Sequence, residues 1–377
     1  MGIVTVIYGN EIRKMVQRLL AETSALDIIR SQDMVVLKPN LVVSRQEWRG
    51  VNTDPRIIEA LVEVLKQHGV SRITIADGSG MGYNATKAFA VCGYKEMAKR
   101  YGLKLVDLER DRFVKRPVQA DGPFRSLEIA RTVLDCDVLI NVPVMKAHSM
   151  TRVTCSLKNL KGVMPRSLKT RFHGVDLSRA ITQLNSILKP DFHLVDGIQG
   201  DLSSETGRSP VMMERLLLGT NPVEVDSVVA DMLGYAPRSI RHIAYSADAG
   251  LGTCALEQIT LRSLNQPTTD IRFQPPEHYT TRFPCQITAE GACCTCMGNL
   301  IFALERLQEQ RLLSHNQHFL IGQRTESFAE NKGLTIAVGQ CATARNSDVD
   351  VCLDVCPPSA GMIYRRVEET MRHHKRD

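Results

Sequence analysis

The chain has 377 residues, of which 43% are hydrophobic and 23% charged, and this balance excludes an intrinsically disordered protein. Its formal net charge of +6 is a mild excess, and aromatic residues make up only 5%, which disfavours a base-stacking nucleic-acid platform. No apolar run reaches the roughly 18 residues that span a bilayer, and Glu11 stands where a secretory signal would be apolar. We therefore expect a cytoplasmic protein of about two or three domains, with neither a membrane nor a nucleic acid as partner.

The first 250 residues alternate short apolar runs with amphipathic helical patterns. Runs of strand length lie at residues 34–38, 72–77, 104–108, 138–144 and 192–196. Helical spacing separates them, for example from Pro55 to a C-cap at Gly69. Strand and helix in this order predict βαβ units, and hence an α/β fold with a mainly parallel, doubly wound sheet.

The composition changes after residue 250. Residues 251–289 are rich in Pro and Thr, and we interpret them as a connecting segment. A helical run from Met297, two apolar runs and a helix after Pro358 then predict a smaller, cysteine-rich α/β lobe. We therefore expect a substrate-binding core over 1–250, a connection over 251–289 and a cluster-binding lobe over 290–377.

Polar residues follow the predicted strands at their C-terminal ends. Ligands of open α/β sheets bind outside these ends, although an aspartate in such a place can equally cap the next helix. The residues concerned are Lys38, Asn40, Asp77, Ser79, Asp107, Lys146, His148 and Asp196. Taken together, they predict one shared crevice.

A basic segment runs from Val138 to Val175 without an acidic residue. It would suit a carboxylate or phosphate, with the N-terminus of a following helix adding its dipole, although a solvated basic face is the alternative. Residues i and i+2 of an extended segment face the same side, so Lys146 and His148 are our catalytic candidates. His148 would donate or accept the proton, because imidazole titrates near physiological pH.

Cysteines are the most informative residues of the sequence, since seven of the eleven lie in the last 93 positions. Reduced cytosolic thiols argue for metal or redox chemistry rather than disulfides. Cys293 and Cys296 share a C-x-x-C turn, Cys341 follows an apolar run, and Cys356 precedes a Pro-initiated helix. Four thiolates from such turns suit a [4Fe-4S] cluster or a structural zinc ion.

Two further cysteines compete for places in this ligand set. Cys294 neighbours Cys293, and Cys352 lies four residues before Cys356, so either could replace its neighbour. Cys92, Cys136, Cys155 and Cys254 have no partner at ligand spacing, and we expect them to be small buried side chains.

Five motifs carry a resemblance to a known family. They are VLKPNL (36–41), IADGSG (75–80), Lys146-x-His148 running into LKNLKG (157–162), VDGIQG (195–200) and Cys-Pro-Pro (356–358). With them the chain resembles the domain of unknown function 362 family, a group of uncharacterised iron–sulfur centre proteins. The resemblance implies an α/β core and a cysteine-ligated iron–sulfur centre, and it implies no reaction. The ferredoxin module appended in some members is absent here.

We therefore predict an iron–sulfur protein with one [4Fe-4S] cluster on Cys293, Cys296, Cys341 and Cys356, acting as a redox enzyme on a small anionic substrate. An electron-donor protein is a further expected partner. The substrate-binding residues would be Lys38, Asn40, Asp77, Ser79, Lys158, Asn159, Lys161 and Asp196. The alternatives are an electron-transfer or metallocofactor-handling protein without its own catalysis, and a zinc-stapled small-ligand binder.

Overall fold

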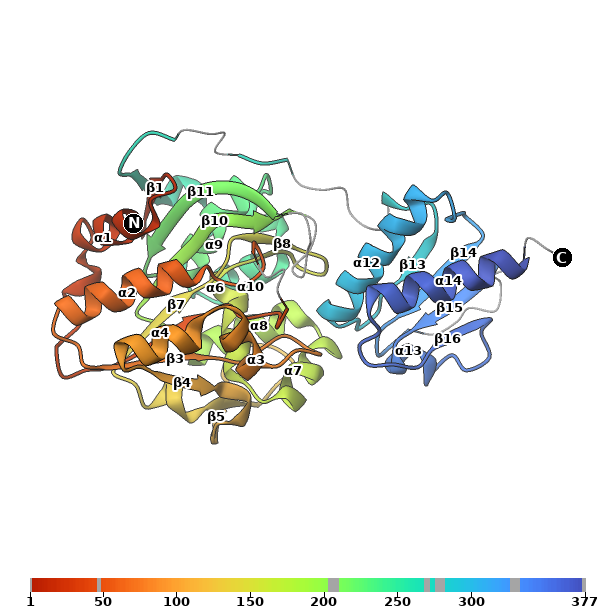
Figure 1. Cartoon of the computed structure of the whole chain (residues 1–377), viewed down its shortest axis with the longest axis horizontal. Helices are drawn as coiled ribbons and strands as arrows, with labels where there is room; N and C mark the ends of the chain where they lie inside the picture. The colour runs from red at the N-terminus through yellow and green to blue at the C-terminus, as the bar shows by residue number, and fades with distance from the viewer. Residues whose placement is uncertain are drawn as a thin grey trace. The chain divides into compact units, whose positions relative to one another are not determined.

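The computed structural model describes residues 2–45, 49–202, 210–267, 272–274, 282–325 and 333–374. It divides into two compact units (Figure 1). The first unit comprises Met1–Lys169 and Asp176–Pro275, and the second comprises Thr170–Val175 and Pro276–Asp377. A short stretch from the middle of the chain therefore belongs to the C-terminal unit.

The first unit is built on an eight-stranded sheet of order β12-β1-β11-β10-β7-β2-β3-β4, in which β11 runs antiparallel to both of its neighbours. The other strand pairs of this sheet are parallel. The strands are β1 (Gly2–Tyr8), β2 (Met34–Pro39), β3 (Arg72–Asp77), β4 (Lys104–Asp107), β7 (Val138–Val142), β10 (Phe192–Asp201), β11 (Pro210–Gly219) and β12 (Ile259–Ser263). The predicted α/β class with a mainly parallel sheet is confirmed.

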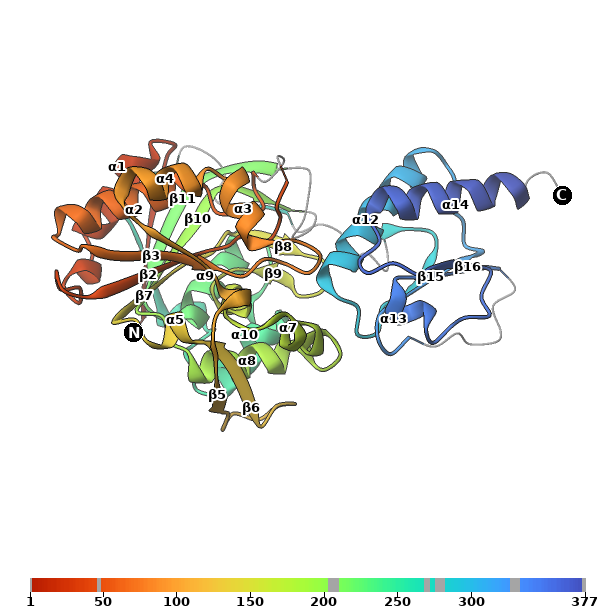
Figure 2. The same cartoon turned by 60° about the horizontal axis from the view of Figure 1, so that its bottom comes forward.

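Helices cover both faces of this sheet (Figure 2). Along β1, Ile7 packs into one apolar cluster while Val4 and Val6 pack into the other, as the alternation of a strand requires. The first cluster is covered by α1 (Ile12–Ala21), α2 (Pro55–Gln67), α3 (Ala85–Val91) and α4 (Tyr94–Tyr101). The second is covered by α6 (Ser156–Asn159), α8 (Leu177–Ile187), α9 (Pro222–Met232) and α10 (Arg241–Asp248).

Smaller elements complete the first unit, and the last of them, the helix Arg166–His173, begins in the first unit and ends in the second. Two antiparallel hairpins form, one from β5 and β6 and one from β8 and β9. Their bounds and those of two short helices are β5 (Phe113–Pro117), β6 (Ser126–Ala130), β8 (Lys146–His148), β9 (Arg152–Thr154), α5 (Arg131–Leu134) and α7 (Arg166–His173). The hairpin of β8 and β9 carries both catalytic candidates.

Several expected boundaries need correction. Strand β12 lies inside the expected connection over 251–289, because its backbone pairs with β1 at the edge of the large sheet. Strand β10 continues past residue 196 to Asp201, since its pairing with β11 resumes after an irregularity between Gly197 and Gln199. Asp196 therefore lies within a strand rather than at its end. The run at 138–144 stops at Val142, before Pro143.

The second unit holds a four-stranded parallel sheet whose strands follow one another in chain order. Its elements are β13 (Gln286–Thr288), α12 (Cys294–Glu309), β14 (Gln317–Ile321), β15 (Leu334–Val338), α13 (Gln340–Thr343), β16 (Val351–Leu353) and α14 (Ala360–His374). All residues of β14 and β15 are buried, so these two strands form the centre of its core. Because β13 begins at residue 286, the unit starts earlier than the expected boundary at 290.

Candidate functional site

Four thiols of the second unit lie close enough to affect one another's ionisation. Cys293 is the N-cap of α12, and its Sγ accepts the Cys296 backbone N–H at 3.4 Å. The hydrogen bond to Cys293 and burial raise the pKa of Cys296 far above its ordinary value, and Cys356 and Cys341 add to the effect. Burial and then Cys293 raise the pKa of Cys341 and of Cys356. The four cysteines therefore lie in one neighbourhood of the second unit, and their role as metal ligands stays a prediction.

Local backbone geometry places these thiols. Gly339 has φ +91°, which an L side chain rarely adopts, and it turns the chain from β15 into α13 so that Cys341 falls in the first turn. A Cβ at Gly339 would lie 3.7 Å from Cys296 Sγ, so the turn passes beside the buried thiol. Cys341 and Cys356 are exposed, whereas Cys293 is half-buried and Cys296 buried. The group therefore lies at the surface of its unit.

The donor set fits a metal group bound through sulfur. The hydrogen bond to Cys293 and the charges of neighbouring cysteines raise the pKa of Cys296, and a metal cation among the thiols would reverse that effect. Four cysteines from a helix cap, a turn and a strand end are the donors of iron–sulfur clusters and of structural zinc. Among the residues that the structure describes, no group of three or more His, Cys, Asp or Glu side chains is arranged so that it could hold a metal ion.

The two rival cysteines differ in what can be said of them. Cys352 turns its thiol toward the backbone oxygens of Asn346, at 3.6 Å, and Ser347. The side chain of Cys294 lies outside the described part of the chain. Cys285 is buried, which raises the pKa of its thiol to about 11.

In the first unit, Lys38 and Asp77 form a buried ion pair, with Lys38 Nζ 2.6 Å from Asp77 Oδ1. The second carboxylate oxygen accepts the Leu41 N–H at 2.7 Å. Burial lowers the pKa of Lys38, and Asp77 opposes that shift. Gly162 permits the close approach, because a Cβ there would lie 2.1 Å from Asp77 Oδ1 and 2.7 Å from Lys38 Nζ. Asp77 thus balances a neighbouring lysine rather than capping a helix.

A second buried pair lies beside the first. Lys169 Nζ donates to Glu109 Oε1 at 2.9 Å and to the Ser79 carbonyl at 3.1 Å. Arg166 also pairs with Glu109. The buried Ser79 hydroxyl has no hydrogen-bond partner within the described ranges. Sequence reasoning missed Glu109, and the acid-free segment gave no signal of it, because the carboxylate comes from 57 residues away from Arg166.

Lys146 and His148 are both buried on β8. Lys146 Nζ donates to Asn40 Oδ1 at 2.9 Å and to the Val51 carbonyl. The Nδ1 atom of His148 accepts the backbone N–H groups of Met150, at 3.0 Å, and Thr151, at 3.2 Å. Its ring proton therefore resides on Nε2, which makes His148 a hydrogen-bond donor through that atom.

A chain of buried amides leads inward from Lys146. Asn40 Nδ2 donates to Asn159 Oδ1 at 2.9 Å, and Asn159 Nδ2 donates to Asn141 Oδ1 at 2.8 Å. Asn141 Nδ2 lies 3.0 Å from Nδ1 of His193, whose burial lowers its pKa to about 3. His193 is thus neutral and accepts this bond. Asn141 and His193 lie within or at the start of predicted apolar runs. For that reason no pattern in the sequence indicates that they form buried hydrogen bonds.

Three expected features of the anion site take other roles. Asp196 accepts the N–H groups of Asp54 and Ile198, and burial raises its pKa to about 7, so it anchors the start of α2. Asp107 caps the 3-10 turn that follows β4 by accepting the Glu109 N–H. The N-terminus of α6, expected to face an external anion, is instead filled by the carboxylate of Asp226 from α9.

The last two lysines of the predicted set are half-buried. Lys158 lies on α6 near His242, and burial together with Lys158 lowers the pKa of His242 to about 3. Lys161 lies in the 3-10 turn that follows α6. The structure therefore joins Lys146, Asn40 and Asn159 in one network, which meets the Lys38–Asp77 pair at the Pro39 carbonyl.

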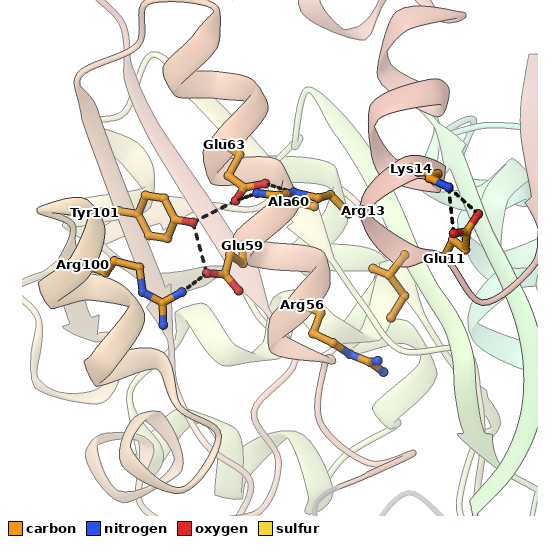
Figure 3. Close-up of a pocket in the computed structure, with 10 residues that line it drawn as sticks. Glu11, Arg13, Lys14, Arg56, Glu59, Ala60, Glu63, Arg100 and Tyr101 are labelled. Atoms are coloured by element: carbon orange, nitrogen blue, oxygen red, sulfur yellow. Dashed lines mark hydrogen bonds and ion pairs between the residues drawn. The ribbon is translucent and has the colours of Figure 1, made fainter.

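A cavity of about 580 Å³ lies apart from these residues, among α1, α2 and α4 (Figure 3). Its charged side chains bond to one another: Arg100 pairs with Glu59, Arg13 pairs with Glu63, and Tyr101 Oη lies within 3.1 Å of both carboxylates. None of the predicted site residues lines it. We interpret it as a surface ion-pair network.

Comparison with known proteins places this geometry in a family. Residues 35–231 match the model described as Domain of unknown function (DUF362), which is more than half of the chain. The chain belongs to the DUF362 family. The matched region of this DUF362 member contains the Lys38–Asp77 pair, the Lys146 network and Asp226, whereas the four thiols of the second unit lie beyond it.

One relative of this DUF362 protein is the "Thylakoid-associated protein sll1697" of Synechocystis sp. (strain ATCC 27184 / PCC 6803 / Kazusa). It is 26% identical over 242 residues, which are 61% of this chain and 72% of the relative. Among solved structures, the lactate racemase apoprotein from Thermoanaerobacterium thermosaccharolyticum shares 15% identity with a TM-score of 0.36, over 52% of this chain and 50% of that one. That likeness is too low to bear on fold or function. Of the described helices, none has the length and apolar character of a membrane span.

Proposed function

We propose that this protein is an iron–sulfur protein whose second unit holds one [4Fe-4S] cluster on Cys293, Cys296, Cys341 and Cys356. The observation that carries the proposal is geometric: a Cβ at Gly339, two residues before Cys341, would lie 3.7 Å from Cys296 Sγ and 3.7 Å from Pro358 Cδ, and Cys293 caps the helix that holds Cys296. A cluster there would supply one-electron redox chemistry. Zinc fits the same donors and is the competing occupant.

The chain's own contribution to such a centre comes from its backbone and from burial. The Cys296 N–H already donates to Cys293 Sγ, and hydrogen bonds to sulfur stabilise its anionic form. The 16-residue helix α12 begins at Cys294, so its positive end lies beside Cys293. Both features favour thiolates at this end of the helix. A reducing compartment such as the cytoplasm would keep the thiols available.

Anaerobic purification tests the proposal. We expect iron and sulfide at about four each per chain, and a broad absorbance shoulder near about 400 nm from thiolate-to-iron charge transfer. Metal analysis of the same sample decides between the occupants. One zinc ion per chain with a featureless visible spectrum would show a structural zinc site instead of a cluster. A metal-free protein with four titratable thiols would contradict both the cluster and the zinc site.

The substrate-binding part of the proposal rests on the first unit. We infer a site for a small anionic substrate around Lys146 and His148, where a buried ammonium and the Nε2–H of an imidazole occupy the same short strand. Half-buried Lys158 and Lys161 would add positive charge. Lys38, by contrast, is already balanced by Asp77. A redox enzyme of this kind would receive its electrons from a donor protein.

Electron transfer or metallocofactor handling without catalysis is the second candidate. It is favoured by the exposure of Cys341 and Cys356 and by the internal pairing of the lysines Lys38 and Lys169. Isothermal titration of phosphate, sulfate and small carboxylates into the wild-type protein separates the two. Binding that is lost in both Lys146→Ala and His148→Ala supports the enzyme. Equal binding by all three proteins favours the carrier.

A further inference from the structure

Helix α6 is a single turn, Ser156–Asn159, whose backbone is bonded by side chains from three other elements. Asn141 of β7 donates to the Ser156 carbonyl at 3.1 Å, and Asn185 of α8 donates to the Leu157 carbonyl at 2.9 Å. The remaining bonds come from α9. An isolated turn of this length is unstable in water, so these side chains determine its position.

Asp226 supplies the bonds from α9. Its Oδ1 accepts the Ser156 N–H at 2.7 Å, and its Oδ2 accepts the Leu157 N–H at 3.0 Å. The carboxyl group is wholly buried, and the Cys155 thiol also faces it. Such a carboxylate, two-fold bonded to consecutive N–H groups, fixes both the place and the direction of the turn.

The position of α6 determines the position of Asn159, which is its last residue. Asn159 bonds Asn40 at 2.9 Å, and Asn40 Oδ1 accepts from Lys146 Nζ at the same distance. A displacement of α6 would therefore reach the Lys146 ammonium through two side-chain amides. Lys38 meets this route at the Pro39 carbonyl, which both Lys38 Nζ and Asn159 Nδ2 approach at 3.3 Å, but its shorter bond, at 2.6 Å, is to Asp77.

We propose that Asp226 is a positioning residue for Lys146: its carboxylate holds α6 so that Asn159 and Asn40 present an oxygen to the lysine. The inference deepens the proposed function, since it gives the substrate site a support from α9. It concerns the placement of Lys146 and not the second unit. Loss of the cluster and loss of this support are thus separate results.

Chemical acylation of lysines in the folded protein, mapped by mass spectrometry, tests the proposal. Lys38 and Lys146 are matched probes, since they are 0% and 1% exposed. In Asp226→Ala we expect Lys146 to react about tenfold faster, because two buried N–H groups lose their acceptor, while Lys38 keeps its protection. Asp226→Asn should lie between, because its amide oxygen still accepts one N–H group.

Asp176→Ala is the matched control variant. Asp176 also accepts two consecutive N–H groups, those of Ser178 and Arg179, but on α8, so its removal should leave Lys146 as protected as in the wild type. Asn159→Ala removes the next link and should reproduce the Asp226→Ala pattern.

Three results would overturn the inference. One is an unchanged Lys146 rate in Asp226→Ala. Another is an equal rise at Lys38 and Lys146, which means general loosening. The third is an Asn159→Ala protein in which Lys146 stays protected. Should Asp226→Ala not fold, the same comparison in Asp226→Asn decides, since that variant keeps the volume of the side chain.

Discussion

In the first unit the buried lysines Lys38 and Lys169 are balanced by the protein's own carboxylates, whereas in the second unit three cysteines raise the pKa of Cys296. Asp77 and Glu109 are held against Lys38 and Lys169 without help from a ligand. The four thiols, by contrast, would repel one another as thiolates, and they become favourable neighbours only when a cation lies among them. The contrast teaches that a run of basic residues in the sequence is weak evidence of a binding site until the carboxylates that pair with them are known.

The largest expected effect is the loss of the cluster when one of the four cysteines of the second unit is replaced. Alanine at Cys293, Cys296, Cys341 or Cys356 should remove or degrade the cluster, because each supplies one of four thiolates. Iron counted per chain under anaerobic conditions measures the loss. Cys352→Ala is the control and should keep its iron, since its thiol bonds to the Asn346 carbonyl. Full iron in the Cys341→Ala and Cys356→Ala proteins would contradict this ligand set.

The buried ion pair gives the next largest effect. Asp77→Ala leaves the Lys38 ammonium buried without its partner, and we expect a loss of about 3–5 kcal/mol in the free energy of unfolding. Urea denaturation measures it. Asp121→Ala is the control, because Asp121 is 89% exposed in its pair with Arg179 and should change stability by less than about 1 kcal/mol. Similar losses in both variants would mean that the buried pair stabilises the fold no more than the exposed pair does.

The pH dependence of stability tests the titration of the buried Asp226 carboxyl group. Burial raises the pKa of Asp226 from 3.8 to about 7, so the folded state binds the proton more tightly than the unfolded state. Its contribution to stability is present below about pH 4 and is lost as pH rises through 7, by up to about 4 kcal/mol. Buried His193 and His242 act in the opposite sense, since acidification below about pH 6.5 must charge them.

The difference between wild type and Asp226→Asn isolates the carboxyl group from these histidines. We expect the unfolding free energies of the two proteins, measured by urea denaturation from pH 4 to pH 8, to converge or cross as pH changes through this window. Parallel profiles would show that Asp226 does not titrate there.

A smaller effect concerns ligand binding in the first unit. If Lys146 holds an anion, Lys146→Gln should weaken phosphate binding about tenfold, or about 1.4 kcal/mol, by isothermal titration. Lys14→Gln is the control, because Lys14 is 74% exposed and pairs with Glu11. Equal affinities in both variants would leave the first unit without a ligand-facing cation at this position.

The smallest expected effect lies at the outer cavity. Arg100→Ala removes an ion pair with Glu59 in which the arginine is 62% exposed, and we expect a change of about 0.5 kcal/mol in the free energy of unfolding. Thermal and urea denaturation both measure it. A loss of several kcal/mol would mean that this surface network is as important as the buried pair.

The sequence was sufficient for the α/β class and for the four thiols that the structure brings together, while their role as metal ligands stays a prediction. Each of those inferences depended on short-range signals: alternating runs, a C-x-x-C turn, a proline after Cys356. The partners of the basic residues were different. Asp226 lies 70 residues from Ser156, and no local pattern reports a contact at that separation. Strands β1, β11 and β12 were missed for the same reason, since their pairing is long-range.

The place of β1 in the sheet has a consequence for synthesis on the ribosome. Residues 2–8 emerge before the other strands of this sheet, yet their neighbours are β11 (Pro210–Gly219) and β12 (Ile259–Ser263). At about 5–20 residues per second, the first strand waits on the order of 10–50 s for the strands that flank it. Strands β2, β3 and β4 can pair during that interval. A nascent chain of this protein therefore carries an unpaired apolar strand while the centre of its sheet is already forming, and a holdase chaperone would find its target there.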